Sequence, residues 1–404
     1  MSKKRAFPAP TMITTSAEVA TLCAKLQREA FVTVDTEFVR ESTYWPRLCL
    51  VQLGGADDVA LIDACVPGID LSPLAALLAA PDCVKVFHAA RQDLEIFLHL
   101  FGELPVNLFD TQIAAMVAGF GEQVGYDNLV SSLTGQSIDK SHRFSDWAAR
   151  PLSKAQIAYA SADVTHLRVI YETLLHQLEE QGRRAWVEDE LSALGEVEFF
   201  RPDPYLLWKK LKPRTHNRKM LAILRDVVAW REEAAQQEDR PRQRIIRDES
   251  LLEIAATRPR DTMALKRIRG VTKEFAEGPL GHALLAAVQR GEQCPEEDWP
   301  EAPSRRKADV PRPPAGVLAL LKVLLTARSE EGRVAPRLIA SAEELERLAH
   351  GESDLPVLKG WRARLFGREA QALLRGETVL CVEKGQLRIV ERDSHPPMNM
   401  GQKG

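Results

Sequence analysis

The sequence predicts a mixed α/β domain followed by two all-helical modules. Strand and hairpin patterns gather in the first 90 residues, whereas no convincing strand follows residue 201 before the very end of the chain. The helical part also contains a weak repeat, because Ile254-Ala255 recurs 85 positions later as Ile339-Ala340. The predicted boundaries are an α/β domain over 1–195, helical modules over 205–291 and 314–385, a linker rich in proline and charge over 292–313, and a flexible tail over 386–404.

The composition is that of a soluble globular protein, with 404 residues, 45% of them hydrophobic and 27% charged. The net charge of −3 hides a difference between the two halves. Residues 1–200 hold 16 Lys and Arg against 27 Asp and Glu, whereas residues 201–404 hold 38 against 30. An acidic half before a basic half indicates a metal-loaded catalytic unit joined to an anion-binding unit, although plain surface composition gives the same difference.

The six cysteines show no C-x-x-C spacing and lie mostly inside apolar runs. This usage is typical of buried thiols in a reducing compartment. No run of about 18 apolar residues predicts a membrane span, and no apolar stretch follows the basic residues at the start as a signal peptide requires. We therefore expect a cytoplasmic protein that does not contact membranes.

Local signals place the elements of the α/β domain. Thr15-Ser16-Ala17-Glu18 is a capping box that opens the first helix. A helix is expected near Arg91, and the longest helix is expected from Ser153, where Ser153 and Gln156 form a second capping box. The expected strands cover 32–38, 48–53, 59–63 and 84–88, the middle two forming a hairpin.

The first of these strands carries two acids, Asp35 and Glu37. Residues two apart on a strand share a face, so both carboxylates point the same way. In apolar surroundings they repel each other and lose hydration, and a divalent cation relieves both effects. Oxygen ligands suit Mg²⁺ or Mn²⁺ rather than zinc. An edge strand with solvated acids is the alternative interpretation.

Two later helices supply further candidates. Asp93 is expected in the first turn of the helix near Arg91. On the longest helix, Tyr159 and Asp163 are four residues apart and lie on one face beside the apolar stripe. Taken alone, such a pair is more often found at the rim of a helix face than in a catalytic site.

In chain order, the patterns D-x-E, H-x-x-x-x-D and Y-x-x-x-D resemble the DEDD exonuclease superfamily in its tyrosine subclass. The resemblance spans about residues 12–190 and implies a mixed-sheet, ribonuclease H-like domain. The histidine subclass has a histidine five positions before the last acid, where this chain has Ala158. The resemblance implies five catalytic residues. Four of them, Asp35, Glu37, Asp93 and Asp163, would bind two divalent cations, which are Mg²⁺, Mn²⁺ or another divalent ion. The fifth, Tyr159, would help to place the attacking water.

Further segments resemble the ribonuclease D family. They are Asp35–Phe38, Phe109–Gln112, the stretch from Lys140 to Trp147, and Arg150–Leu152. The two helical modules resemble that family's tandem HRDC domains, and Leu358–Arg362 supports the second of them. The resemblance implies a 3′–5′ exoribonuclease that releases 5′-mononucleotides and trims tRNA precursors with 3′ extensions or other structured RNA. We expect it to be a monomer.

Two other functions remain open. A DNA repair exonuclease would share the catalytic half, but no polymerase region follows and no G-x-x-x-x-G-K-[ST] nucleotide loop is present. A non-catalytic RNA-binding scaffold usually loses ligands, whereas all four acids and the tyrosine are present here.

Several residues are predicted to contact RNA. Phe38 is expected to stack on the terminal base, or else to belong to the core, and His88 is expected to touch a phosphate, or else to cap a strand end. A run of six basic residues without an acid, which is a solvated face in the alternative interpretation, is expected to bind phosphates in the helical half: Lys209, Lys210, Lys212, Arg214, Arg218 and Lys219.

Overall fold

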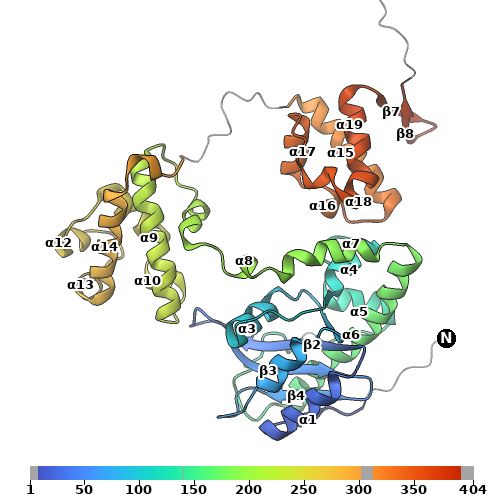
Figure 1. The fold of residues 1–404 in the computed structure, drawn as a ribbon, viewed down its shortest axis with the longest axis horizontal. Helices are drawn as coiled ribbons and strands as arrows, with labels where there is room; N and C mark the ends of the chain where they lie inside the picture. The colour runs from blue at the N-terminus through green and yellow to red at the C-terminus, as the bar shows by residue number, and fades with distance from the viewer. Residues whose placement is uncertain (1–7, 140, 302–312, 393–404) are drawn as a thin grey trace, which may run out of the picture. The chain divides into compact units, whose positions relative to one another are not determined.

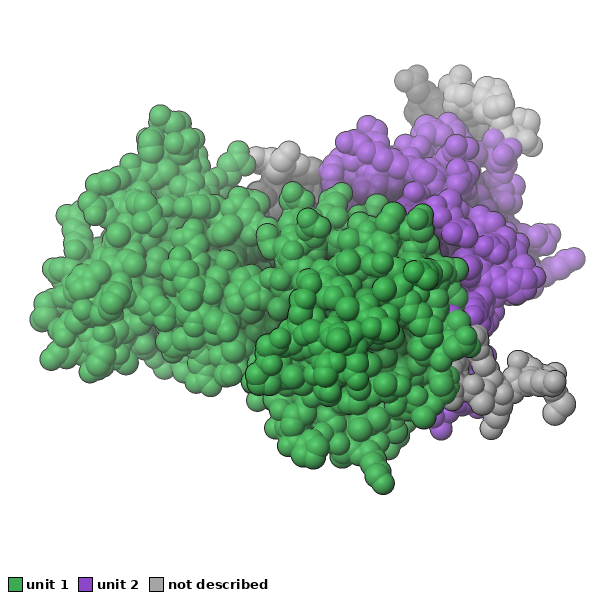
Figure 2. All heavy atoms as spheres, turned by 60° about the horizontal axis from the view of Figure 1, so that its bottom comes forward, with its two compact units in different colours: residues 1–108, 139–165, 192–309 green, residues 109–138, 166–191, 310–404 purple. Residues whose placement is uncertain are grey.

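The computed structural model of the protein describes residues 8–139, 141–301 and 313–392. The chain divides into two compact units, coloured green and purple in Figure 2. The first unit contains residues 1–108, 139–165 and 192–309, and the second contains residues 109–138, 166–191 and 310–404. Each unit therefore combines part of the predicted α/β domain with one of the predicted helical modules.

A six-stranded mixed sheet forms the centre of the α/β part, in the order β1-β4-β3-β2-β5-β6. β2 and β4, labelled in Figure 1, both pair antiparallel with β3. β1 pairs parallel with β4, and β5 pairs parallel with β2. Every residue of β3 after its first is buried, which explains the apolar run in this central strand. The strands are β1 (Thr11–Ile13), β2 (Phe31–Val39), β3 (Arg47–Gly54), β4 (Val59–Asp63), β5 (Val84–Phe87) and β6 (Leu108–Asp110).

The local predictions for this part are confirmed for four strands, which are β2 to β5. Both capping boxes are present, because Thr15 accepts a hydrogen bond from the backbone of Glu18 and Ser153 accepts one from the backbone of Gln156. β1 and β6 were not predicted, since strands of three residues are too short to show an alternating pattern. The helices of this part in the first unit are α1 (Ser16–Leu26), α2 (Ser72–Leu78), α3 (Arg91–Phe101) and the first half of α6 (Lys154–Glu180).

The first helical module belongs to the first unit. α9 and α14 pack closely because Gly291 of α14 faces the backbone of α9, where a Cβ atom would lie 2.5 Å from the Cα of Ile223. α14 ends at Gln293, just inside the predicted linker, and residues 302–312 of that linker lie outside the described residues. The module comprises α9 (Arg218–Gln237), α10 (Arg242–Ile245), α11 (Asp248–Thr257), α12 (Thr262–Leu265), α13 (Lys273–Glu277) and α14 (Pro279–Gln293), with 3₁₀ helices at Pro204–Leu211 and Glu296–Asp298. A 3₁₀ helix at Ser192–Gly195 and α8 (Val197–Phe200) precede it in the first unit.

The second unit joins the helices that follow β6 to the second helical module. Trp186 of α7 stacks on Trp361 of α18 with ring centroids 4.6 Å apart, and Arg183 donates hydrogen bonds to the carbonyls of Val117 and Gly332. The helices are α4 (Thr111–Ala118), α5 (Tyr126–Thr134), α7 (Arg184–Leu191), α15 (Ala315–Gly332), α16 (Pro336–Ile339), α17 (Ala342–Ala349), α18 (Gly360–Arg362) and α19 (Arg368–Arg375), with a 3₁₀ helix at Pro356–Leu358 and a π-helix at Ala363–Gly367.

An antiparallel hairpin of β7 (Thr378–Glu383) and β8 (Gln386–Glu391) follows these helices. The predicted start of the tail at residue 386 is therefore wrong for the six residues of β8. Residues 393–404 of that tail lie outside the described residues. Among the helices that the structure describes, none is both long enough and apolar enough to cross a membrane.

Candidate active site

Three carboxylates meet beside β2. Asp35 and Glu37 lie two residues apart on this strand, so their side chains share a face. Asp163 of α6 is the third acid, and one oxygen atom from each of the three lies within 4.8 Å of the others. The pairing of β2 with β3 shifts register directly after Glu37, and such irregularities are frequent next to active sites. The three residues are called the acid cluster below.

A close contact between α6 and the sheet brings Asp163 to this place. Thr33 of β2 donates a hydrogen bond from Oγ1 to the carbonyl oxygen of Val164 at 2.8 Å. Gly54 of β3 lies at the same point, where a Cβ atom would clash with the Thr33 hydroxyl and lie 3.1 Å from the Val164 oxygen. The glycine therefore allows the approach of α6 that places Asp163 beside the acids of β2.

Asp93 lies in the first turn of α3, as predicted, but is not a member of the acid cluster. Thr36 of β2 donates a hydrogen bond from Oγ1 to Asp93 Oδ1 at 2.5 Å, which holds the carboxylate against the strand. The charge of Asp93 still acts on Glu37, because it helps to raise the pKa of that carboxyl.

Burial raises the pKa of all three acids in the cluster. For Glu37, desolvation is the largest cause, and the charges of Asp35 and Asp163 add to it. For Asp163, desolvation again leads, followed by the charge of Asp35. Three carboxylates this close together, partly or fully buried, cannot all ionise at low cost, so this arrangement favours a bound cation.

Tyr159 lies one turn before Asp163 on α6. Burial raises the pKa of its hydroxyl, and the charges of Asp163 and Glu37 raise it further. The ring of Trp147 packs beside it, with centroids 6.0 Å apart. The phenol therefore stays protonated at neutral pH, where it can donate and accept hydrogen bonds but cannot act as a base.

The side chains fit a hard divalent cation. The acid cluster offers only carboxylate oxygens, which Mg²⁺ and Mn²⁺ prefer. Gln52 lies opposite Asp35 in the β2–β3 ladder, is fully buried, and its amide has no hydrogen-bond partner among the described residues. A buried amide beside three acids requires a polar partner, and a water molecule held by a bound cation would supply one.

Phe38 and His88 are partly buried and lie on segments that carry the acids. Phe38 follows Glu37 directly on β2, and His88 lies between β5 and α3, the helix of Asp93. Their contact with RNA stays a prediction.

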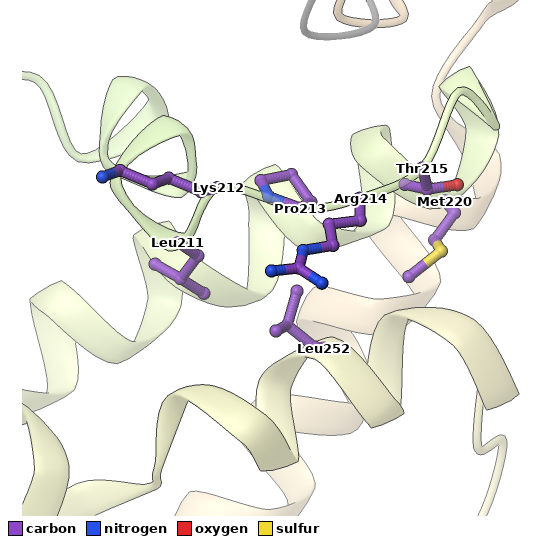
Figure 3. Close-up of a pocket in the computed structure, with 7 residues that line it drawn as sticks. All are labelled: Leu211, Lys212, Pro213, Arg214, Thr215, Met220 and Leu252. Carbon is purple, nitrogen blue, oxygen red and sulfur yellow. The ribbon is translucent and has the colours of Figure 1, made fainter.

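The predicted basic region borders a groove of about 480 Å³ in the first helical module (Figure 3). Its apolar floor includes Leu252 of α11, toward which the Arg214 side chain points. The lining residues are Leu211, Lys212, Pro213, Arg214, Thr215, Met220 and Leu252.

The six predicted basic residues differ in what surrounds them. Arg218 donates hydrogen bonds to the carbonyl oxygens of Trp299 at 2.9 Å and Pro300 at 3.3 Å, so its guanidinium already binds the backbone of the module. Lys219 is half-buried. The exposed members are Lys209, Lys210, Lys212, Arg214 and Arg218.

Sequence reasoning missed Thr36, Gln52 and Arg143. A signal existed for Gln52, since a lone amide in an otherwise apolar strand is unusual. Thr36 acts through a hydrogen bond and Arg143 through its charge, each on residues of distant segments, which no local pattern reveals. The positive charge of Arg143 lowers the pKa of Glu37 and of Tyr159, against the effect of the acids.

Comparison with known proteins decides the family. The 3′–5′ exonuclease family matches residues 10–179, and the HRDC domain family matches residues 220–288. Ribonuclease D of Gluconacetobacter diazotrophicus is 58% identical over 390 residues, which is 96% of this chain and 99% of that protein. This chain belongs to the ribonuclease D family.

Other members of the ribonuclease D family are also similar to this chain over most of its length. The protein from Granulibacter bethesdensis is 56% identical over 385 residues, covering 95% of this chain and 97% of its own length. The crystal structure of Escherichia coli RNase D, an exoribonuclease involved in structured RNA processing, superimposes with a TM-score of 0.77 and 32% identity over 92% of this chain and 99% of that one.

Membership confirms the predicted function and fold. The chain is a 3′–5′ exoribonuclease, a hydrolase of the DEDD family, and it carries a nucleic-acid-binding HRDC domain. Its α/β exonuclease core is followed by a helical C-terminal region, as the sequence predicts. DEDD exonucleases use divalent metal ions, and a cluster of acids is present in this chain.

Proposed function

We propose that this enzyme trims unpaired 3′ ends of structured RNA, above all tRNA precursors with 3′ extensions, by two-metal hydrolysis with Mg²⁺ or Mn²⁺. The observation that carries the mechanism is the acid cluster, in which oxygen atoms of three carboxylates, one buried and two partly buried, lie within 4.8 Å of one another. The role of the E. coli relative in structured RNA processing supports the substrate class.

In this proposal, each of the four acids has a role in cation binding. Asp35, Glu37 and Asp163 are cation ligands, and Asp93, held by Thr36, completes the set. When bound, such cations lower the pKa of water and stabilise negative charge on the phosphate, so that hydrolysis releases a 5′-mononucleotide.

Tyr159 assigns the enzyme to the tyrosine subclass in this proposal. Its hydroxyl stays neutral because burial and the neighbouring acids raise its pKa. A neutral hydroxyl at this place accepts or donates one hydrogen bond and thereby orients the attacking water toward the phosphate.

The helical region supplies RNA affinity in this proposal. The second helical module is a second HRDC domain, an assignment supported by the repeat between Ile254-Ala255 and Ile339-Ala340. The exposed Lys209, Lys210, Lys212 and Arg214 bind phosphates at the groove of the first module. The enzyme works as a monomer in the cytoplasm, where its six free thiols stay reduced.

One assay tests this function. Purified full-length protein with Mg²⁺ acts on four 5′-labelled substrates: a 3′-extended tRNA precursor, mature tRNA, single-stranded RNA and single-stranded DNA. We expect stepwise shortening from the 3′ end that stops near the mature end of the tRNA and that EDTA abolishes. Shortening of DNA as fast as RNA would favour a repair exonuclease, and an uncut tRNA precursor beside degraded single-stranded RNA would contradict the proposed substrate.

A further inference from the structure

The loop before α6 presents an exposed aromatic ring and an exposed arginine. Phe144 is 90% exposed, more than any other large hydrophobic side chain among the described residues. Arg143 packs on this ring, with its Cζ 5.4 Å from the ring centroid. Within the described chain, Arg143 forms no hydrogen bond or ion pair. Neither side chain therefore contributes much to the stability of the fold, because the ring is not buried and the charge is not paired.

A turn fixes the position of both side chains. The backbone NH of Ser145 donates to the carbonyl oxygen of His142 at 3.0 Å, which makes Arg143 and Phe144 the two central residues of a β-turn. The ring of His142 adds a second contact, with its Nδ1 3.3 Å from Ser145 Oγ. The arginine and the ring are thus held at the tip of an ordered turn.

Residues after the turn hold it beside the proposed active site. Trp147 is 2% exposed and packs against Tyr159 in a buried cluster that includes Leu50. Leu50 is the residue of β3 that pairs with Glu37. Gln156 of α6 donates to the carbonyl oxygen of Asp146 at 3.3 Å. The effect of the Arg143 charge on the pKa of Glu37 agrees with this position.

A flat apolar ring and a neighbouring cation match the two faces of an unpaired nucleotide. Aromatic rings stack on the bases of single strands, and the arginine guanidinium binds backbone phosphates. We propose that the turn of Arg143 and Phe144 binds the unpaired 3′ end of the RNA, with Phe144 stacking on a base and Arg143 contacting an adjoining phosphate. The inference rests on the proposed active site and adds a selective element to it, because a base inside a duplex cannot stack on Phe144.

The test uses full-length protein with Asp35→Asn, so that the RNA stays intact during binding. The probe is a hairpin RNA with an unpaired 3′ tail that carries 2-aminopurine, whose fluorescence is quenched by stacking. Phe144→Ala should remove the quenching and weaken binding by roughly 5- to 100-fold, and Phe144→Trp should restore both. Arg143→Ala should lower the slope of log K against log salt by about 0.7, and Arg143→Lys should restore it.

Matched controls separate this site from general surface effects. Leu100→Ala removes another exposed apolar side chain, which is 45% exposed, and Arg28→Ala removes another exposed arginine. Neither should change quenching or affinity. With a blunt hairpin RNA, Phe144→Ala should bind like its parent, since no unpaired base is present.

Several results would overturn the inference. They are unchanged quenching and affinity within twofold for Phe144→Ala, equal losses in the Leu100→Ala control, or equal losses on blunt RNA. Failure of the proposed active site is a separate result, because RNA would then be shortened by the Asp35→Asn protein itself. In otherwise wild-type protein, Arg143→Ala should raise KM for the tailed RNA, as expected for loss of a contact with the bound substrate.

Discussion

The acid cluster and Glu232, both in the first unit, are carboxylate sites that differ in their neighbours. In the acid cluster, Glu37 has only other acids close by, apart from the charge of Arg143, and its pKa is raised by burial and by those acids. In the first helical module, Glu232 is 2% exposed but accepts hydrogen bonds from Arg242 and, at 2.5 Å, from the Tyr44 hydroxyl. Burial again acts to raise the pKa of Glu232, but these hydrogen bonds outweigh it and the pKa is lowered.

The difference separates a structural site from a functional one. Glu232 is neutralised within the protein and holds the loop of Tyr44, which follows β2, to α9 and α10. In the acid cluster, the charge of Arg143 lowers the pKa of Glu37 but does not outweigh burial and the neighbouring acids, so protonation or bound cations are favoured there. The pKa is thus raised for the carboxyls of the proposed functional site and lowered for the carboxyl of the ion pair.

The largest expected effect is on catalysis by the acid cluster. Asp35→Ala should lower the rate of hydrolysis by at least about 10³-fold. The substitution removes a carboxylate proposed to hold the cations that activate water and stabilise negative charge on the phosphate. Circular dichroism and the thermal midpoint should match or exceed those of the wild type. Hydrolysis near the wild-type rate with an unchanged midpoint would show that the cluster is not the active site.

The next effect concerns Tyr159. Tyr159→Phe deletes the hydroxyl but keeps the packing on Trp147 and all four acids, so RNA affinity should persist. The single-turnover rate at saturating Mg²⁺ should fall by roughly 10² to 10³. A rate within about threefold of wild type would leave the hydroxyl without a catalytic role.

Substitution of Glu232, the carboxylate paired with Arg242, should have the opposite effect, because it should lower stability without lowering the catalytic rate. Glu232→Ala leaves Arg242 and the Tyr44 hydroxyl without their acceptor and should lower the free energy of unfolding by roughly 2 to 4 kcal/mol, measured by urea denaturation. The folded fraction should hydrolyse RNA at the wild-type rate. The neighbouring exposed Glu233→Ala is the control and should change stability by less than about 0.5 kcal/mol.

A smaller effect is expected on stability against pH without metal. The raised pKa values of the acid cluster mean that the folded protein binds more protons than the unfolded chain above about pH 4, so stability should fall as pH rises. The thermal midpoint should drop by about 3 to 8 °C between pH 5 and pH 8 and recover with Mg²⁺. Asp35→Asn should flatten this dependence. A wild-type thermal midpoint that does not change with pH would show that the acids do not destabilise the fold when they ionise. Glu232, whose pKa is lowered, contributes with the opposite sign and loses its effect only in acid.

Local patterns in the sequence predict the strand and helix that carry the acids. They predict less well the hydrogen bonds that the acids form with other segments. Alternation on β2 predicts the shared face of Asp35 and Glu37, and the capping box at Ser153 predicts the start of α6. The hydrogen bond from Thr36 to Asp93 and the docking of Tyr44 on Glu232 join residues far apart in sequence, so no periodicity indicates them.

The C-terminal hairpin was missed although a signal was present. Lys384 and Gly385 form its two-residue turn, with φ of 51° and 80°, between two segments rich in β-branched residues. Patterns of this kind carry less weight at the end of a chain, where a tail is the usual expectation.

The central claim is that the acid cluster is a cation site and that the Glu232 network is not. Isothermal titration with Mn²⁺ tests it on the wild type, Asp163→Asn and Glu232→Gln. The account predicts two Mn²⁺ per wild-type chain, at least one fewer for Asp163→Asn, and no change for Glu232→Gln. Equal Mn²⁺ binding by the wild type and Asp163→Asn would contradict it.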